Sequence, residues 1–348
     1  MNGRRGKDTV LIVSARGDAH VDDVMKELLK STTDAVVLYS EDLTMDVSLG
    51  FSLEPRSESM WNWSMVFHHG GLVDDGTVKS VWWRKPSHYY GLPPDLSAQE
   101  REFGKGEFDQ FFGSVWSLLE TYWMNHPEKN RAAAWKLEQL VRAKRMGATV
   151  PRTIVSNSPE AVASFYEECN GKIVYKVMTD PLLGAVALSE KSPNAEIDAL
   201  RETKTTAIGP SELEELGGVR LVPGLFQEHV PKRCEYRVTI IGDEIFAARI
   251  DSQAADGTKV DWRNWTKGGL DIPYSAAILR PETEQLCRDL TTSYGLQFAA
   301  IDLVETPDGD DVFLELNPNG QFIWVEKLAP ELKMTSALAA ALLRGSST

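Results

Sequence analysis

Two carboxylates and one amide on neighbouring apolar segments have the residue types of a hard-cation site. Asp302 ends the apolar segment 298–302. Glu315 and Asn317 are two residues apart in the segment 313–317. Side chains two apart on a strand share a face, and a register that pairs the two segments can bring Asp302 to that face. Oxygen ligands of this kind suit magnesium bridged to substrate phosphates. The alternative interpretation is a polar sheet face with a surface hairpin.

Three cations could serve an anionic ligand near that cluster. Lys176 interrupts the apolar segment 173–177, and a lysine within a buried strand needs an anionic partner. Lys136 lies on a predicted helix, and Arg249 ends the segment 245–249. Three separated cations around one carboxylate cluster would suit a triphosphate. Taken singly, each of them fits a surface or ion-pair role better.

The segment 225–231 could bind a nucleotide base. It is an apolar strand that runs into a proline, and its backbone groups could pair with the edge of an adenine. Glu235 could then accept hydrogen bonds from ribose hydroxyls. The alternative, favoured by the pattern alone, is an edge strand that ends at proline. In this interpretation the strand runs into Glu228 and Val230, just before the proline.

The elements that must position these residues begin with a strand–helix–strand unit. Residues 9–13 and 35–39 have the pattern of buried strands, and residues 20–30 have an amphipathic helical period. This order predicts a parallel sheet. A long helix is predicted over 100–123.

The rest of the chain has more strands than helices. A strand pair is predicted at 172–177 and 185–188. Further strands are predicted at 224–230, 235–241, 244–250, 298–304 and 311–316, and helices at 281–294 and 334–343. A polar stretch at 125–130 marks a first boundary. We therefore expect a mixed α/β (α+β) fold with domains at 1–125, 126–218 and 219–348.

Composition excludes several classes of function. Acidic residues outnumber basic ones 51 to 37, for a net charge of −14, which argues against a nucleic-acid-binding protein. The 3 cysteines form no CxxC pair, so neither a disulfide framework nor a zinc site is expected. No apolar run approaches the ~18 residues of a membrane helix. Dinucleotide-binding, P-loop and nucleophile-elbow fingerprints are absent. We expect a cytoplasmic protein that binds neither nucleic acid nor membrane.

The order of these residues resembles the ATP-grasp ligases. The finer similarity is to the ATP-grasp ribosomal peptide maturases, the microviridin-type or graspetide synthetases, and it covers nearly the whole chain. Its most specific segments are 80–86 (SVWWRKP), 150–153 (VPRT), 226–232 (FQEHVPK), 261–263 (DWR) and 314–321 (LELNPNGQ). The resemblance implies an ATP-grasp fold with a pre-ATP-grasp N-terminal domain, a central lid domain and a C-terminal catalytic domain.

The resemblance also implies roles for individual residues. Lys136 and Lys176 would contact ATP phosphates, and Glu235 would hold the ribose. Arg249 would hold the reacting phosphate, with Arg237 as a second catalytic cation. The adenine would lie against Gln227, Glu228, His229 and Val230, and magnesium would be held by Asp302, Glu315 and Asn317. One departure is the loop 178–184, which has a single glycine where many ATP-grasp proteins have a glycine-rich phosphate loop.

The reaction implied is ATP-dependent activation of Asp or Glu side chains in a precursor peptide. Attack by Ser or Thr hydroxyls or Lys amines would give ester or amide macrocycles, ADP and phosphate. The implied partner is the precursor peptide, with leader and core. A homodimer is compatible with this expectation. Two other functions stay open at this point. One is a ligase that adds free amino acids to an acceptor, and the other is a nucleotide-binding regulatory module without turnover.

Overall fold

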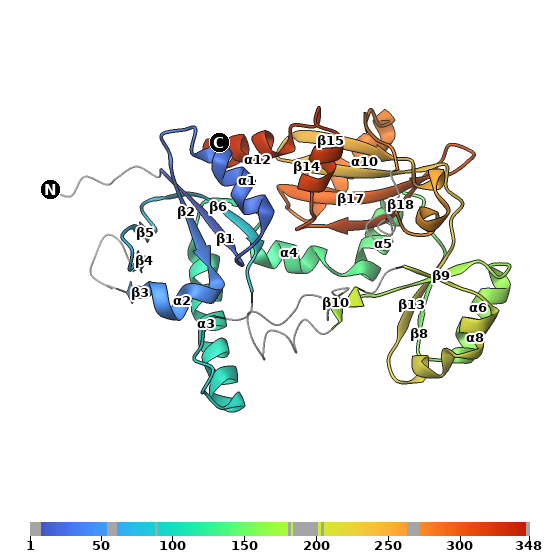
Figure 1. Ribbon diagram of the computed structural model, residues 1–348, viewed down its shortest axis with the longest axis horizontal. Helices are drawn as coiled ribbons and strands as arrows, with labels where there is room; N and C mark the ends of the chain where they lie inside the picture. The colour runs from blue at the N-terminus through green and yellow to red at the C-terminus, as the bar shows by residue number, and fades with distance from the viewer. Residues whose placement is uncertain are drawn as a thin grey trace.

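The computed structural model describes residues 8–53, 61–87, 90–179, 182–183, 201–202, 205–262 and 272–345 (Figure 1). Its strands form a four-stranded sheet near the N-terminus, a second four-stranded sheet in the middle of the chain and a five-stranded sheet near the C-terminus. Figure 1 shows the first sheet on the left, the middle sheet at the lower right and the last sheet at the upper right. None of the described helices has the length and apolarity needed to cross a bilayer.

The N-terminal sheet confirms the predicted parallel unit. Its strand order is β2-β1-β6-β7, and every pairing is parallel. The strands are β1 (Thr9–Ser14), β2 (Asp34–Tyr39), β6 (Val78–Lys85) and β7 (Tyr122–Met124). Helix α1 (Ala19–Leu28) connects β1 to β2, and the side chain of Asp18 caps its first turn. A small antiparallel sheet of β3 (Val47–Leu53), β4 (Trp61–Phe67) and β5 (Leu72–Asp74) lies beside it, next to the short η1 (Ser40–Asp42) and α2 (Leu43–Asp46).

The helix predicted over 100–123 is shorter than expected. Helix α3 (Ala98–Leu118) starts at a capping box between Ser97 and Glu100. It ends because Leu119 takes an extended conformation, with ψ at 99°. The chain then enters β7, whose pairing with β6 overrides the helical period of these residues.

The middle sheet has the order β12-β9-β13-β8. Its strands are β8 (Thr153–Ser156), β9 (Ile173–Lys176), β12 (Thr206–Ile208) and β13 (Gly224–Glu228). They are accompanied by α6 (Pro159–Glu168), α8 (Pro210–Glu214) and η3 (Leu216–Arg220), and β10 (Leu182–Leu183) pairs with β11 (Arg201–Glu202). The strand predicted at 185–188 lies outside the described residues.

The C-terminal sheet is antiparallel, in the order β16-β15-β14-β17-β18. Its strands are β14 (Cys234–Ile241), β15 (Glu244–Ile250), β16 (Tyr274–Ala277), β17 (Phe298–Glu305) and β18 (Asp311–Asn317). Helices α4 (Pro127–Ala133), α5 (Lys136–Arg145), α10 (Pro281–Ser293), α11 (Ile323–Leu328) and α12 (Met334–Arg344) accompany it, with the short η4 (Ser252–Ala254) and η5 (Asp256–Thr258).

The sheets divide the chain differently from the domains expected. Strand β13 belongs to the middle sheet, so that sheet continues to Glu228, beyond the expected boundary at 218. Helix α5 was expected in the central domain but packs on the C-terminal sheet, where Gln139 exchanges hydrogen bonds with the backbone of Leu316. Helix α12 returns to the N-terminal sheet, and Ser80 donates to the carbonyl of Leu342 at 2.8 Å. One apolar core therefore joins the N-terminal and C-terminal sheets. The three cysteines are buried and free.

Candidate active site

A cavity of about 790 Å³ lies between the middle and C-terminal sheets. It is lined by every residue proposed above for nucleotide and magnesium except Arg249. Residues of α4 and α5 and the end of β6 contribute to the same wall. The structure thus brings together side chains that are far apart in the sequence, from Lys85 to Trp324.

The oxygen cluster lies on one face of the C-terminal sheet. Asp302 is the register partner of Glu315, and Ala300 is the partner of Asn317, so the three polar side chains share that face. A register shift directly after Asp302 places a bulge in β18 beside Glu315. Asn317 donates to Glu315 Oε1 at 3.2 Å. The strand pairing predicted from the sequence is therefore confirmed at these positions.

The donor set fits a metal that takes most of its ligands from a substrate. Within the described residues no three His, Cys, Asp or Glu side chains form a metal site by themselves. The cluster instead offers two carboxylates and an amide. Magnesium in nucleotide sites commonly takes one or two protein carboxylates and fills its shell with water and phosphate oxygens. Asp302, Glu315 and Asn317 suit that role.

Lys136 links this cluster to the middle sheet. Its Nζ lies 3.3 Å from Glu315 Oε2 and donates to the carbonyl of Val177 at 2.9 Å. Lys176, one residue earlier at the end of β9, lines the same cavity and is half-buried. The ammonium of Lys136 therefore lies between the end of β9 and the oxygen cluster, and Lys176 lines the same cavity.

Arg237 supplies a buried positive charge on the opposite side of Asp302. It is 6% exposed, and it donates to Asp302 Oδ1 at 2.7 Å and to the carbonyl of Gln321 at 3.3 Å. Its Nε has no hydrogen-bond partner in the described part of the chain. A buried guanidinium nitrogen without a partner is costly, so an anion in the cavity would complete its hydrogen bonding.

Strand β13 is an interior strand, which rules out the edge-strand alternative. It pairs with β8 on one side and β9 on the other. Gln227 donates to Thr153 Oγ1 at 3.1 Å, and Glu228 accepts from the backbone of Arg152 at 3.1 Å. Thr153, the first residue of β8, thus holds Gln227, and Arg152 just before it holds Glu228. The sheet ends at Glu228, and His229 and Val230 continue along the cavity wall toward β14.

Glu235 and His229 form the neighbouring wall. Glu235 is buried and accepts from Lys232 Nζ at 3.0 Å, while Lys232 also donates to the carbonyl of Val260 at 2.9 Å. Burial, with the positive charges of Lys232 and Lys172 nearby, lowers the pKa of His229. The imidazole is therefore neutral at pH 7. Its Nε2 is buried and has no hydrogen-bond partner among the described residues.

The structure does not bring Arg249 to the cavity, which corrects the role expected for it. Arg249 is the register partner of Tyr236, whereas Arg237 is the partner of Ala248. Successive strand residues face opposite sides, so Arg249 lies on the sheet face away from Arg237. There it pairs with Asp251 at 2.8 Å and lies 3.9 Å from Glu305. Of the two arginines, Arg237 is the one that lines the cavity.

Sequence reasoning missed several residues that line this cavity. Asn319 and Gln321 follow the predicted ligand Asn317, and their position within the segment 314–321 was the available signal. Between them, Gly320 has no room for a side chain, because a Cβ there would lie 2.3 Å from Ala300 Cβ. Lys85, Arg131, Trp262 and Trp324 also line the cavity. The rings of Trp262 and Trp324 stack at 4.6 Å.

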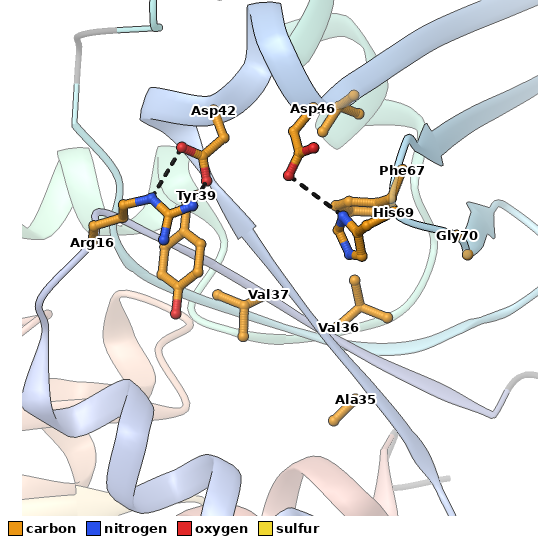
Figure 2. Close-up of a pocket in the computed structure, with 12 residues that line it drawn as sticks. Arg16, Ala35, Val36, Val37, Tyr39, Asp42, Asp46, Phe67, His69 and Gly70 are labelled. Carbon is orange, nitrogen blue, oxygen red and sulfur yellow. Dashed lines mark hydrogen bonds and ion pairs between the residues drawn. The ribbon is translucent and has the colours of Figure 1, made fainter.

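A second, smaller cavity of about 320 Å³ lies along β2 in the N-terminal region (Figure 2). Its charged side chains pair with one another. Arg16 donates to Asp42 at 3.0 Å, and His69 lies 3.4 Å from Asp46. It contains none of the residues proposed from the sequence. The larger cavity is therefore the candidate active site.

Comparisons with known proteins agree with this arrangement. No protein-family model matches the sequence, and no curated protein matches it significantly. Among solved structures, the macrocyclase MdnC of Microcystis aeruginosa MRC, bound with precursor peptide MdnA, is 27% identical, with a TM-score of 0.81 over 96% of this chain and 99% of that one. The macrocyclase MdnB of the same organism is 24% identical, with a TM-score of 0.73 over 96% and 99%.

A third solved structure has a similar fold at lower identity. The RiPP-associated ATP-grasp ligase of Chryseobacterium gregarium is 22% identical, with a TM-score of 0.82 over 97% of each chain. The similarity thus extends over all three sheets and the cavity between them. The chain has an ATP-grasp fold, and over nearly its whole length its architecture is similar to that of the macrocyclase MdnC and the RiPP-associated ligase.

Proposed function

We propose that this chain is an ATP-dependent ligase that closes side-chain macrocycles in a ribosomal precursor peptide. An Asp or Glu carboxylate of the peptide is joined to a Ser or Thr hydroxyl as an ester, or to a Lys amine as an amide. The proposal rests mainly on one observation. The oxygen cluster around Glu315 lines the same cavity as Lys136 and Arg237. The similarity to MdnC, which was solved with a precursor peptide, supports the choice of substrate.

The cavity has a suitable place for each part of ATP. The adenine would lie where the chain leaves β13, against the backbone of Glu228 to Val230 and the neutral ring of His229. Glu235 would accept hydrogen bonds from the ribose. Lys136 and Lys176 would then meet the phosphates.

In the first step, a carboxylate oxygen of the peptide attacks the γ-phosphorus of ATP. The bond from that phosphorus to the bridging oxygen breaks, ADP leaves, and an acyl phosphate forms. Phosphoryl transfer depends mainly on positioning and on stabilising negative charge. Lys136 and Arg237 supply fixed positive charge on two sides of the oxygen cluster. Magnesium held by Asp302, Glu315 and Asn317 would offset further charge on the transferring group.

In the second step, a hydroxyl or amine of the same peptide attacks the acyl carbon. The carbon–oxygen bond to phosphate breaks, phosphate leaves, and the nucleophile loses one proton. Each link therefore consumes one ATP and removes the elements of one water from the peptide. Because the nucleophile belongs to the bound peptide, it is present at high effective concentration, and no separate pocket for a free amino acid is required.

The test is ADP release by the purified chain with ATP and magnesium. We expect release to rise when a candidate precursor peptide, rich in Thr or Ser and in Asp or Glu and sought among the short reading frames next to this gene, is added with no free amino acid present. A rise that requires a free amino acid would support the amino-acid-adding ligase instead. Tight nucleotide binding without any ADP release would support the regulatory module. We further propose that the chain works in the cytoplasm, in keeping with its free, buried cysteines. A homodimer is a second proposal, which gel filtration with light scattering tests.

A further inference from the structure

The loop that follows the metal-ligand strand β18 is held from behind by the N-terminal sheet. We call residues 317–323 the site loop. Arg84, near the end of β6, donates from Nη1 to the carbonyls of Asn319 at 2.8 Å and Gly320 at 3.1 Å. His20 Nε2, at the start of α1, accepts from the backbone N–H of Phe322 at 3.1 Å and Ile323 at 3.3 Å. Two side chains from the first quarter of the chain therefore hold four peptide groups of the site loop.

Arg84 is a buried charge whose Nε and Nη1 have acceptors, and its Nη2 lies 3.2 Å from His20 Nδ1. It is 2% exposed, and its Nε donates to Asp18 Oδ2 at 2.9 Å. A guanidinium is stable in such a place only when it is paired and its donors are satisfied. The two loop carbonyls accept hydrogen bonds from Nη1 of the guanidinium. The position of the loop and the position of Arg84 therefore depend on each other.

The contacts of His20 determine its tautomer. Nε2 faces two backbone donors, so it must carry the lone pair and no proton. The proton therefore lies on Nδ1, which donates to Asp18 Oδ1 at 2.8 Å. Asp18 thus fixes both the ring and the guanidinium of Arg84. The three residues form one connected unit behind the site loop.

The opposite side of the site loop faces the cavity. Asn317, Asn319 and Gln321 line the cavity from this loop, and Trp324 follows directly after it. Two further carbonyls of the loop accept side-chain hydrogen bonds, since Asn125 donates to Pro318 at 2.9 Å and Arg237 donates to Gln321 at 3.3 Å. A shift of the loop would therefore move a proposed metal ligand and two polar side chains together.

We propose that Asp18, His20 and Arg84 are positioning residues for catalysis. They fix the backbone of the site loop so that Asn317, Asn319 and Gln321 face the transferring phosphate and the carboxylate that receives it. This inference rests on the proposed function. The inference separates two properties of the site, because the adenine segment starts in β13 and Lys176 ends β9, both in the middle sheet, whereas the unit lies at the N-terminal sheet. Loss of the unit should lower kcat and leave nucleotide affinity nearly unchanged.

Two substitutions of His20 form a matched pair. In His20→Gln the amide oxygen can reach the position of Nε2 and accept from Phe322 and Ile323. In His20→Asn the shorter amide ends near Nδ1, so the bond to Asp18 can persist and the bonds to the loop are lost. Both variants remove the edge contact between the imidazole and the Phe322 ring, at 4.9 Å. Any loss of stability from that contact should therefore be similar in the two.

The test combines kinetics with hydrogen exchange on the full chain. We expect kcat for peptide-dependent ADP release to stay within about 3-fold in His20→Gln and to fall at least about 10-fold in His20→Asn, since a misplacement near 1 Å can cost ~10²-fold. The Kd for a non-hydrolysable ATP analogue should change less than about 2-fold in both. Amide exchange over 317–324 should increase only in His20→Asn.

Other results would overturn the inference. If both variants keep kcat, or if both lose it equally with unchanged exchange over 317–324, His20 does not position the loop. If His20→Asn does not fold, Arg84→Lys serves instead, because it keeps the charge beside Asp18 but cannot reach Asp18 and both carbonyls together. A wild-type chain that releases no ADP counts against the proposed function alone. The exchange difference between the two His20 variants still decides the loop inference in that case.

Discussion

Lys136 Nζ lies 3.3 Å from Glu315 Oε2 and donates to the carbonyl of Val177 at 2.9 Å. One side chain thus connects the C-terminal sheet, which carries the oxygen cluster, to the end of β9 in the middle sheet. Glu315 is paired with a cation that the proposed mechanism assigns to the phosphates. The pair therefore marks the point in the cavity where phosphate, metal and protein charges meet.

Glu315→Gln should remove most phosphoryl transfer while the fold survives. The amide keeps the size of the side chain but loses the charge that would hold magnesium and pair with Lys136. Loss of one such electrostatic stabiliser typically costs ~10²–10³ in rate, about 3–4 kcal/mol. Magnesium-dependent ADP release and circular dichroism should be measured together. The matched control is Glu244→Gln, an exposed position at the start of β15. Turnover near wild type in folded Glu315→Gln would remove Glu315 from the site.

Lys176→Met should weaken ATP binding more than it affects stability. Methionine keeps most of the volume of the stem and removes the charge that faces the cavity. A charge-assisted contact contributes roughly 1.5–3 kcal/mol, so Kd should rise by roughly 10- to 100-fold. Calorimetric titration with a non-hydrolysable ATP analogue measures this. Lys144→Met, an exposed position on α5, controls for the change in net charge. Equal affinities in the two variants would assign Lys176 a structural role.

Arg237→Gln and Arg249→Gln should behave oppositely. Arg237 lines the cavity, and Arg249 lies on the other face of the sheet with Asp251. We expect ADP release to fall by ~10² or more in Arg237→Gln, as for other lost stabilisers of the transition state, and to stay near wild type in Arg249→Gln. Removing one partner of a buried pair can cost ~3–5 kcal/mol, so thermal unfolding of Arg237→Gln must be checked alongside. A large loss of turnover in Arg249→Gln would restore the role first expected for it.

The free energy of unfolding should fall as the pH is lowered below about 6.5. Protonation of His20 should account for part of that fall. Burial lowers the pKa of His20 from its ordinary value of 6.5, although the hydrogen bond to Asp18 opposes the shift and the charges of Arg84 and Lys85 reinforce it. The unfolded chain then binds a proton that the folded chain does not, so the free energy of unfolding decreases with falling pH. His20 contributes less than about 1.4 kcal/mol per pH unit to this decrease in the free energy of unfolding.

The pH effect is measured by denaturant unfolding at pH 7.5 and pH 5.5. His20→Gln should show a smaller loss of stability over this interval than the wild type does. It should keep the part due to His229, whose pKa is also lowered by burial. An identical loss in the two proteins would mean that His20 is charged in the folded state.

Local sequence patterns were sufficient for the parts of the site that depend on strand alternation. Glu315 and Asn317 are two residues apart, so their common face follows from the period of a strand, and their pairing with Asp302 followed from one hairpin. The face that Arg249 takes could not be predicted in this way, because it depends on the register of β15 against β14, which pairs Arg249 with Tyr236 and Ala248 with Arg237. The edge-strand interpretation of 225–231 failed because the partners of β13 are set by two other strands.

Contacts between distant segments could not be predicted in this way. His20 accepts from Phe322, which is 302 residues away, and Arg84 donates to Asn319, which is 235 residues away. Nothing in the residues near Arg84 indicates that its partners are carbonyls of a loop in the C-terminal sheet. The helical period of 100–123 likewise gave no sign that residues 122–124 would pair with β6.

The most direct test of the account is the intact mass of the peptide after reaction. A candidate precursor, sought among the short reading frames next to this gene, is incubated with the purified chain, ATP and magnesium, and ADP is counted in the same sample. The account predicts the loss of one water mass for each ADP formed. It also predicts a region poor in fragments between the linked Thr, Ser or Lys and the Asp or Glu in tandem spectra. A peptide that instead gains the mass of a free amino acid, or keeps its mass while ADP accumulates, would contradict it.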